Sequence, residues 1–134
     1  MVGPVFVDTS ALIALLDRAD PRHEAARSTF LDLADRDLVT HGYVVAETLA
    51  VARRRFGVDG VITVLDDLLP IIDVLPVESA VHASAQSRYR ASLPSGTSFV
   101  DQVSFGVMAQ VSIETAFALD ADFKAAGVSV VPAS

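Results

Sequence analysis

The sequence contains no cysteine, which excludes disulfide bonds and metal sites built from thiolates. Its three histidines, His23, His41 and His82, lack the spacing of metal ligands, and we expect none of them to be catalytic. No apolar run is long enough to cross a bilayer. No basic region precedes the short apolar stretch at the N-terminus, as a signal peptide requires. A cytoplasmic protein with no membrane association is therefore the expectation.

Lysine and arginine are also scarce, with 10 such residues against 17 aspartates and glutamates and a formal net charge of −7. This balance argues against non-specific binding of nucleic acid by bulk attraction. It does not exclude an enzyme that acts on nucleic acid, because a bound divalent cation reverses the local sign of the charge. The length of 134 residues predicts one domain, residues 1–134, and no repeat, linker or low-complexity segment divides it.

Short apolar segments alternate along the chain with amphipathic segments of helical periodicity. The expected strands cover residues 5–7, 38–40, 71–75, 115–119 and 128–131. The expected helices cover residues 11–16, 43–56, 58–69 and 78–93, and further helices begin near residues 21, 98 and 121. Strands separated by helices form parallel sheets that are covered on both faces. We therefore predict the α/β class, as a three-layer α/β/α sandwich with a central parallel sheet.

Two acids, Asp8 and Asp120, each follow an apolar strand. In open α/β sheets the carboxyl ends of the strands hold the reactive groups, at the point where the strand order reverses. Asp8 is followed by the helix-capping types Thr9 and Ser10, so a structural role as a helix N-cap is an equally good interpretation of this residue alone. The surroundings of two further acids favour the functional interpretation.

Glu47 lies within the predicted helix 43–56, among apolar neighbours. The residues one helical turn away on either side are Tyr43, Val44, Ala50 and Val51. A salt bridge would explain a carboxylate there, but the nearest arginine along the helix, Arg54, is two turns away. Because buried charges are usually paired or bound to a metal, we favour a functional role for Glu47.

Asp101 lies in the first turn of the predicted helix that begins at Ser98. The pattern Ser98-x-x-Asp101 resembles a capping box, with Asp in place of Glu, and this structural role is compatible with a functional one. The positive end of the helix dipole favours the ionised carboxylate that a metal ligand needs. Right-handed crossovers place the starts of such helices near the carboxyl edge of the sheet, so we expect Asp101 and Glu47 to meet Asp8 and Asp120 there.

Four carboxylates in one cleft repel each other, by about 4 kcal/mol for two charges ~4 Å apart at an effective dielectric constant of ~20. Such a cluster needs a cation or protonation to persist. Because all the ligands are oxygens, the hard cations Mg²⁺ and Mn²⁺ suit this site better than zinc does. A carboxylate-bound Mg²⁺ activates water and binds phosphate oxygens, so hydrolysis of a phosphodiester is the expected reaction.

Two groups of arginines are candidates for contacts with RNA. Arg53 and Arg54 lie at the end of the predicted helix 43–56, where a favourable interaction with the helix dipole is the alternative explanation. Arg88 lies in the predicted helix 78–93, on a surface that faces either solvent or RNA.

Four segments resemble, in order and spacing, the acidic motifs of PIN-domain nucleases, and most closely those of the VapC-type toxins of bacterial toxin–antitoxin pairs. They are VDTSA (7–11), VAE (45–47), SFVD (98–101) and ALDADF (118–123). The resemblance implies a ribonuclease that depends on Mg²⁺ or Mn²⁺, with Asp8, Glu47, Asp101 and Asp120 as its acidic quartet. It also implies Asp122 as an accessory acid and Ser10 and Ser98 as supporting hydroxyls. The sequence departs from the family pattern at Ala118, where a hydroxyl residue usually stands.

The leading hypothesis is an endoribonuclease toxin that inhibits translation and growth unless its antitoxin binds it. The resemblance implies homodimers and a VapB-type antitoxin whose C-terminal segment blocks the cleft. In the expected mechanism the aspartates hold the metal, and Glu47 holds its water or acts as the base. In-line attack then leaves 5′-phosphate and 3′-hydroxyl ends. Transfer RNA, ribosomal RNA and messenger RNA all remain open as targets.

Two other functions are compatible with parts of the pattern. A catalytically silent PIN-like scaffold would bind partners without cleaving RNA, but such a module gains nothing from unpaired buried acids. A receiver-like module that accepts a phosphoryl group would need paired acids after the first strand and an acceptor aspartate after the third. Here a single acid follows the first strand, and Pro76 follows the third.

Overall fold

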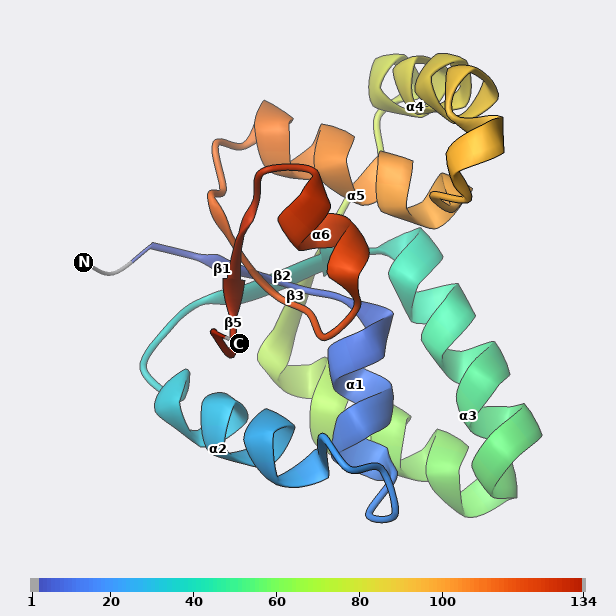
Figure 1. The fold of residues 1–134 in the computed structure, drawn as a ribbon. Helices are drawn as coiled ribbons and strands as arrows, with labels where there is room; N and C mark the ends of the chain where they lie inside the picture. The colour runs from blue at the N-terminus through green and yellow to red at the C-terminus, as the bar shows by residue number, and fades with distance from the viewer. Residues whose placement is uncertain (1–2, 134) are drawn as a thin grey trace.

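The computed structural model describes residues 3–133 and contains a five-stranded sheet in the order β3-β2-β1-β4-β5 (Figure 1). All the strand pairs are parallel, as predicted. The strands are β1 (Val5–Val7), β2 (Leu38–His41), β3 (Ile72–Leu75), β4 (Thr115–Phe117) and β5 (Ser129–Val131). The strand order reverses at β1, because the chain builds the sheet outward from β1 to β3 and then returns to place β4 on its other side. This reversal creates a switch point between β1 and β4.

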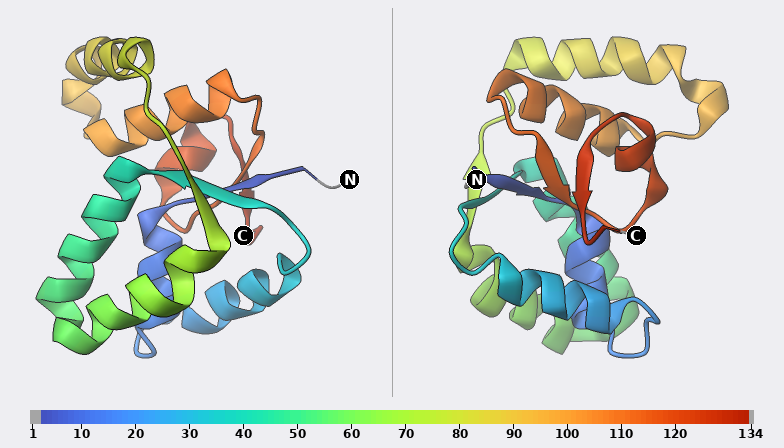
Figure 2. Two further views of the ribbon diagram at one scale, coloured as in Figure 1. Left: turned by 180° about the vertical axis from the view of Figure 1, so that it is seen from behind. Right: turned by 60° about the vertical axis from the view of Figure 1, so that its left-hand side comes forward.

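Helices cover both faces of the sheet, which confirms the three-layer sandwich (Figures 1 and 2). One layer holds α1 (Thr9–Leu16), α2 (His23–Asp32) and α3 (Gly42–Thr63), and the other holds α4 (Ser79–Ala91), α5 (Phe99–Gln110) and α6 (Ala121–Ala125). A π-helical turn (Val64–Leu68) and two 3₁₀ turns (Leu69–Ile71 and Leu93–Ser95) complete the helical segments of the described chain. Across residues 3–133, no helix combines the length and apolarity needed to span a membrane.

The central strand β1 is apolar along its whole length because both of its faces are covered. Val5, Phe6 and Val7 are all buried, and β1 pairs with β2 on one side and β4 on the other. The ring of Phe6 stacks on that of Phe123 in α6, with centroids 6.0 Å apart. This contact holds the short helix α6, which follows Asp120, against the sheet.

Helix α5 lies between the sheet and α4, as its nearly continuous apolar sequence predicts (Figure 2). Val103, Ser104 and Val107 of α5 are buried. The strand predicted over 115–119 is shorter in the structure than expected. Strand β4 ends at Phe117, and the next two residues lead into α6.

Helix α3 contains a backbone break at Gly57, the residue predicted to separate helices 43–56 and 58–69. Gly57 has φ +70° and ψ −157°, whereas the residues on both sides continue as helix. This combination of dihedral angles is accessible essentially to glycine alone. The break lets the first part of α3 run from the end of β2 away from the sheet, beside α1, while the second part turns back beneath the sheet (Figure 1).

Replacing Gly57 should therefore destabilise the protein through the backbone. Neither Gly57 nor Gly42 has any atom within 4 Å of the position that a Cβ would take, so this pair of sites separates backbone strain from steric conflict. We expect Gly57→Ala to lower the free energy of unfolding by about 1–3 kcal/mol, and Gly42→Ala to leave it unchanged or raise it by up to ~1 kcal/mol. Urea denaturation of both variants is the measurement, and equal midpoints would contradict the assigned strain.

Candidate active site

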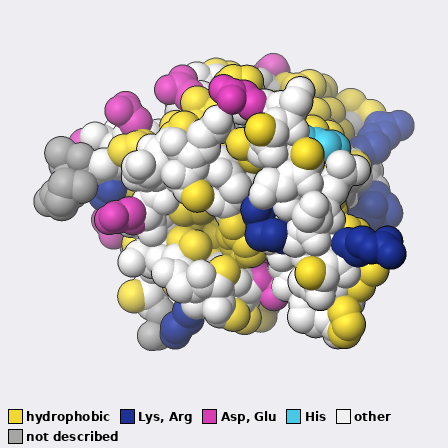
Figure 3. All heavy atoms as spheres, turned by 90° about the horizontal axis from the view of Figure 1, so that it is seen from above, with side chains coloured by type: hydrophobic (Ala, Val, Ile, Leu, Met, Phe, Trp, Pro, Cys, Tyr) yellow, Lys and Arg dark blue, Asp and Glu magenta, His cyan; other side chains and the backbone are white. Residues whose placement is uncertain are grey.

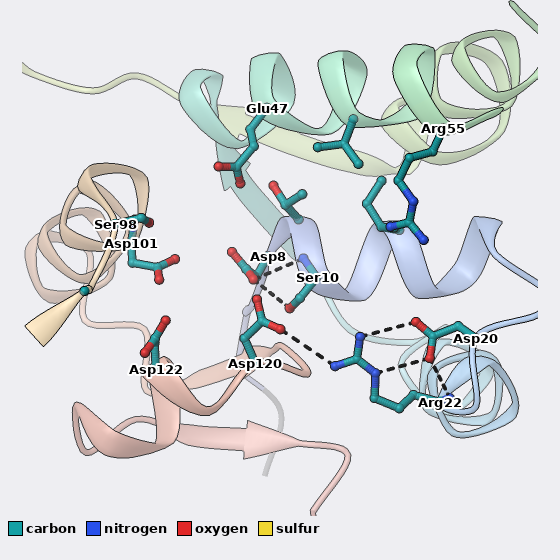
Figure 4. A pocket seen from close by; sticks show the side chains of 14 residues that line it. Asp8, Ser10, Asp20, Arg22, Glu47, Arg55, Ser98, Asp101, Asp120 and Asp122 are labelled. Carbon is teal, nitrogen blue, oxygen red and sulfur yellow. Dashed lines mark hydrogen bonds and ion pairs between the residues drawn. The ribbon is translucent and has the colours of Figure 1, made fainter. Parts of the chain in front are cut away.

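The predicted acids meet in one cleft of about 350 Å³ at the carboxyl edge of the sheet (Figure 4). The cleft lies at the switch point between β1 and β4, since Asp8 directly follows β1 and Asp120 lies in the connection after β4. All seven residues predicted for the acidic and hydroxyl positions line it: Asp8, Ser10, Glu47, Ser98, Asp101, Asp120 and Asp122.

Asp8 is both a helix cap and the most deeply placed acid of the cleft. Its side chain is only 3 % exposed. One carboxylate oxygen, Oδ2, accepts hydrogen bonds from the backbone N–H of Ser10 at 3.1 Å and from the Ser10 hydroxyl at 2.7 Å. The two interpretations of Asp8 are therefore compatible, because the cap hydrogen bonds fix the direction in which the carboxylate faces the cleft.

The Ser10 hydroxyl joins the two strand ends that carry acids. Besides donating to Asp8, its oxygen accepts a hydrogen bond from the backbone N–H of Leu119 at 2.9 Å. Residue 118 is an alanine and has no hydroxyl to offer. In this chain Ser10 thus supplies a hydrogen bond to the segment that leads into Asp120.

Glu47 lies on the wall of the cleft, on a half-buried face of α3. Its carboxylate forms no ion pair or hydrogen bond with any residue that the structure describes. The neighbouring Thr48, by contrast, is fully buried and donates a hydrogen bond to the Thr9 hydroxyl at 3.1 Å. The expected burial of Glu47 among apolar neighbours is therefore only partial, and its charge opens into the cleft.

Asp101 is held at the start of α5 by the predicted cap. Ser98 is the N-cap residue, and its hydroxyl oxygen accepts a hydrogen bond from the backbone N–H of Asp101 at 3.0 Å. The Asp101 carboxyl group lies across the cleft from that of Asp122 in α6, and this proximity is among the causes that raise the pKa of Asp101.

Mutual repulsion and burial disfavour the ionised acids. Burial, followed by the charges of Asp120 and Glu47, raises the pKa of Asp8 to about 6, although the hydrogen bonds from Ser10 oppose this shift. Burial, followed by the charge of Asp8, raises the pKa of Asp101 to about 7. Within residues 3–133, no three carboxylate or imidazole side chains are gathered tightly enough to enclose a metal ion as they lie. The cleft thus offers converging oxygen donors rather than a closed cage.

The buried His41 connects the two helices that carry Glu47 and Asp101. Its Nδ1 atom accepts a hydrogen bond from the backbone N–H of Tyr43 at 3.1 Å, so its proton lies on Nε2. Nε2 donates to the Ser104 hydroxyl of α5 at 2.8 Å. Burial lowers the pKa of His41 to about 4, which keeps the ring neutral at physiological pH. His41 does not line the cleft, and its role as the N-cap of α3 had no sequence signal.

The arginines predicted to contact RNA do not line the cleft. Arg53 and Arg54 are exposed on other faces of α3. Arg88 joins α4 to α5, because its Nη2 atom donates to the backbone oxygen of Gln102 at 2.9 Å and its Nε atom to the side-chain oxygen at 3.2 Å. The structure gives Arg88 a packing role and leaves RNA contacts by these three residues as a prediction.

Two arginines that the sequence analysis did not select, Arg22 and Arg55, do line the cleft. Arg55 had a signal in the sequence, since it follows Glu47 and Val51 at intervals of four residues and so shares their face of the helix. Arg22 precedes α2 and had none, because only the tertiary fold brings it within 3.7 Å of an Asp120 oxygen.

The sequence profile of the PIN-domain family matches residues 5–128. A curated relative, the 23S rRNA-specific endonuclease VapC20 of Mycobacterium tuberculosis, is 32% identical over 124 residues, which are 92% of this chain and 94% of that protein. The crystal structure of that organism's VapC20, described as a sarcin–ricin loop cleaving toxin, has a TM-score of 0.84 and 30% identity over 92% of this chain and 95% of that one.

A more distant structure shares the fold. VapBC2 from Rickettsia felis, bound to a DNA fragment from its promoter, has a TM-score of 0.70 and 11% identity over 95% of this chain and 96% of that one.

The raised pKa of Asp101 predicts how the stability of the metal-free protein depends on pH. An acid whose pKa is higher in the folded protein destabilises the fold as pH rises through that value. Asp101→Asn removes this charge. In EDTA we expect the variant to melt about 2–5 °C above the parent at pH 8, which corresponds to ~1 kcal/mol, and the difference to shrink at pH 4. The exposed Asp66→Asn is the control, and a difference independent of pH would contradict the assignment.

Ser10→Ala should weaken the junction between the strand ends. It removes the hydroxyl that donates to Asp8 and leaves the backbone N–H of Leu119 without this acceptor. We expect a loss of about 1–3 kcal/mol in the free energy of unfolding by urea denaturation at pH 7. Ser87→Ala is a suitable control, because that exposed hydroxyl makes only a long bond of 3.4 Å to its own helix. Similar losses in both variants would show that Ser10 has no special role.

Proposed function

The chain belongs to the PIN-domain family, and we propose that it is a metal-dependent endoribonuclease that acts as the toxin of a VapBC-type toxin–antitoxin pair. One observation carries this proposal. The acids Asp8, Glu47, Asp101, Asp120 and Asp122 come from distant parts of the sequence and converge in one cleft at the switch point of the sheet. A scaffold that only binds partners has no need of acids whose burial and mutual repulsion raise their pKa values.

The proposed cofactor is Mg²⁺ or Mn²⁺. The ion would be held by Asp8, Asp101, Asp120 and Asp122, because the cleft offers carboxylate oxygens and no sulfur or imidazole ligand. Burial, followed by repulsion among the acids, raises the pKa values of Asp8 and Asp101, and a divalent cation would offset both costs of ionisation, so the residues fit such an ion. When bound, the ion lowers the pKa of water and neutralises charge on the phosphate.

Glu47 is the residue best placed to accept a proton. Its carboxylate opens into the cleft and is engaged by no ion pair in the described chain, whereas Asp8 accepts hydrogen bonds from Ser10 and Asp120 lies 3.7 Å from Arg22. We propose that Glu47 accepts a proton from the water that attacks phosphorus. The P–O3′ bond breaks as the new P–O bond forms, the leaving O3′ takes up a proton from solvent, and the products carry a 5′-phosphate and a 3′-hydroxyl.

The proposed substrate is ribosomal RNA, and the first sequence to examine is the sarcin–ricin loop of 23S rRNA. This proposal is supported by the similarity to VapC20 of M. tuberculosis, a 23S rRNA-specific endonuclease described as a sarcin–ricin loop cleaving toxin. The similarity covers nearly the full length of both chains. The chain is acidic as a whole, but its charges are not evenly spread. In the view of Figure 3, the largest group of lysine and arginine side chains lies on the side of the molecule that bears α3 and α4, beside the carboxyl edge.

The proposed protein partners are a VapB-type antitoxin and a second copy of the chain. The fold is shared with VapBC2 of R. felis, whose name is that of a toxin–antitoxin complex. The second part of α3 and the π-helical turn that follows it expose Val58, Ile62 and Leu65 by 56%, 48% and 47%, at helical spacing. An apolar stripe of this kind on the surface supports contact with another protein.

The proposed activity predicts that RNA cleavage requires both a divalent metal and the acids. Antitoxin-free protein is incubated with 23S rRNA, a sarcin–ricin hairpin, transfer RNA and unstructured RNA, in Mg²⁺, in Mn²⁺ and in EDTA. We expect cleavage with either metal and none in EDTA. The double variant Asp8→Asn, Asp101→Asn should lose at least about 100-fold in rate, because it removes two ligands.

The exposed Asp66→Asn, purified in the same way, should cleave as the parent does. Cleavage that persists in the double variant would point to a contaminating nuclease and overturn the assigned site. A folded protein that cleaves no RNA in the panel would favour the silent scaffold over the enzyme. Sequencing of the product ends tests the expected 5′-phosphate directly.

A further inference from the structure

The cleft has a basic end as well as an acidic one. Of the 14 side chains that line it, Arg22 and Arg55 are the only cations. Figure 4 shows them on one side of Asp8, whereas Asp101 and Asp122 lie on the other. A strand of RNA in this cleft therefore passes from carboxylates to guanidinium groups over a short distance.

Arg55 reaches the cleft from α3, eight residues after Glu47, which is about 12 Å along the helix axis. Its Nη2 atom pairs with Asp17 Oδ2 at 2.8 Å, and its side chain stays 45% exposed. This is the only hydrogen bond that its guanidinium group makes to residues 3–133. Donors of Arg55 are thus available to a ligand in the cleft.

Arg22 reaches the same end of the cleft from the connection between α1 and α2. Its Nε and Nη2 atoms donate to the two oxygens of Asp20 at 3.2 and 3.3 Å. Its Nη1 atom has only long contacts, at 3.4 Å to the backbone oxygen of Leu119 and 3.7 Å to Asp120. These distances lie at or beyond the limit of a good hydrogen bond, so a phosphate oxygen can replace them at little cost.

One short connection, residues 17–22, orients both arginines. Asp17, which pairs with Arg55, also accepts a hydrogen bond from the backbone N–H of Ala19 at 3.1 Å. Asp20 likewise accepts one from the backbone N–H of Arg22 at 2.8 Å. Exposed ion pairs of this kind stabilise a fold by only ~0–1 kcal/mol, so a gain in stability does not explain why both arginines reach the cleft. They do hold the guanidinium groups in place, which reduces the entropy lost when a ligand binds.

We propose that Arg22 and Arg55 form a subsite for a backbone phosphate of RNA next to the phosphate that is cleaved. This inference rests on the proposed ribonuclease activity and deepens it. The acids and their cation would engage the reacting phosphate, and the planar guanidinium groups bind the neighbouring one, for which their donor geometry is well suited. The subsite offsets the repulsion between an acidic cleft and a polyanion, and it gives the RNA a fixed direction across the site.

The salt dependence of RNA binding tests this subsite, because each phosphate contact to a single strand contributes about 0.7 to the slope of log K against log[salt]. A fluorescent single-stranded RNA is titrated in Mg²⁺ with Asp101→Asn protein, which keeps the RNA intact. Adding Arg55→Gln or Arg22→Gln should weaken binding by about 10-fold at low salt and reduce the slope by ~0.7. Arg27→Gln, an exposed arginine of α2 that does not line the cleft, is the matched control and should change neither.

A chemical variant of the RNA gives an independent test. Methylphosphonate linkages, each of which removes one phosphate charge, are introduced one at a time along the strand. Parent protein should lose affinity at one linkage beside the cleavage site, and the Arg55→Gln variant should lose no more there. Arg55→Lys should retain the salt slope, since it keeps the charge, but should bind more weakly because it lacks the planar fork.

The outcomes separate this subsite from the proposed activity. If the parent binds and cleaves RNA while the Arg22 and Arg55 variants behave like Arg27→Gln, the subsite is wrong and the ribonuclease stands. If the parent binds no RNA in the presence of metal, the ribonuclease fails and the subsite fails with it. Thermal melting of each variant confirms that a weaker affinity does not come from unfolding.

Discussion

Burial of the Asp8 carboxylate is the constraint on which the rest of the site depends. A charge that is only 3 % exposed is unfavourable unless hydrogen bonds or a cation offset the lost hydration. Ser10 supplies two hydrogen bonds, but the nearby acids oppose their effect, and the pKa of Asp8 rises to about 6. The unfavourable charge that remains supports the proposal that the cleft binds a divalent cation together with a phosphate.

The elements around Asp8 hold the other acids at the same cleft by different means. Ser10 attaches the segment before Asp120 to the end of β1, and Ser98 caps the helix that carries Asp101. His41 caps α3 and reaches Ser104 of α5. These hydrogen bonds are made by neutral groups, so they fix the positions of the carboxylates without neutralising them. The arginines stand apart, paired with Asp17 and Asp20 of the connection between α1 and α2.

Local features of this chain could be predicted because their causes lie within a few residues. The capping of α5 by Ser98, the break at Gly57 and the apolar run of β1 all depend on neighbouring side chains and backbone angles. The arginines that line the cleft could not be predicted, for the opposite reason. Charge near a helix end favoured Arg53 and Arg54, whereas the direction of the α3 axis relative to the cleft places Arg55 there. The direction of a helix is set by its packing against other elements.

The sequence by itself determined which residues are candidates for the chemistry: acids after apolar strands and at helix starts, with no cysteine or suitably spaced histidine to compete. The resemblance to PIN-domain nucleases rests on those same acids. Only the tertiary structure decided that these acids lie together in one cleft. Parallel pairing of β1 with β4, more than 100 residues apart in the chain, brings Asp8 beside Asp120. Strand order is a property of long-range pairing and crossover direction, which no local pattern encodes, and the partners of Arg22 and Arg55 follow from it.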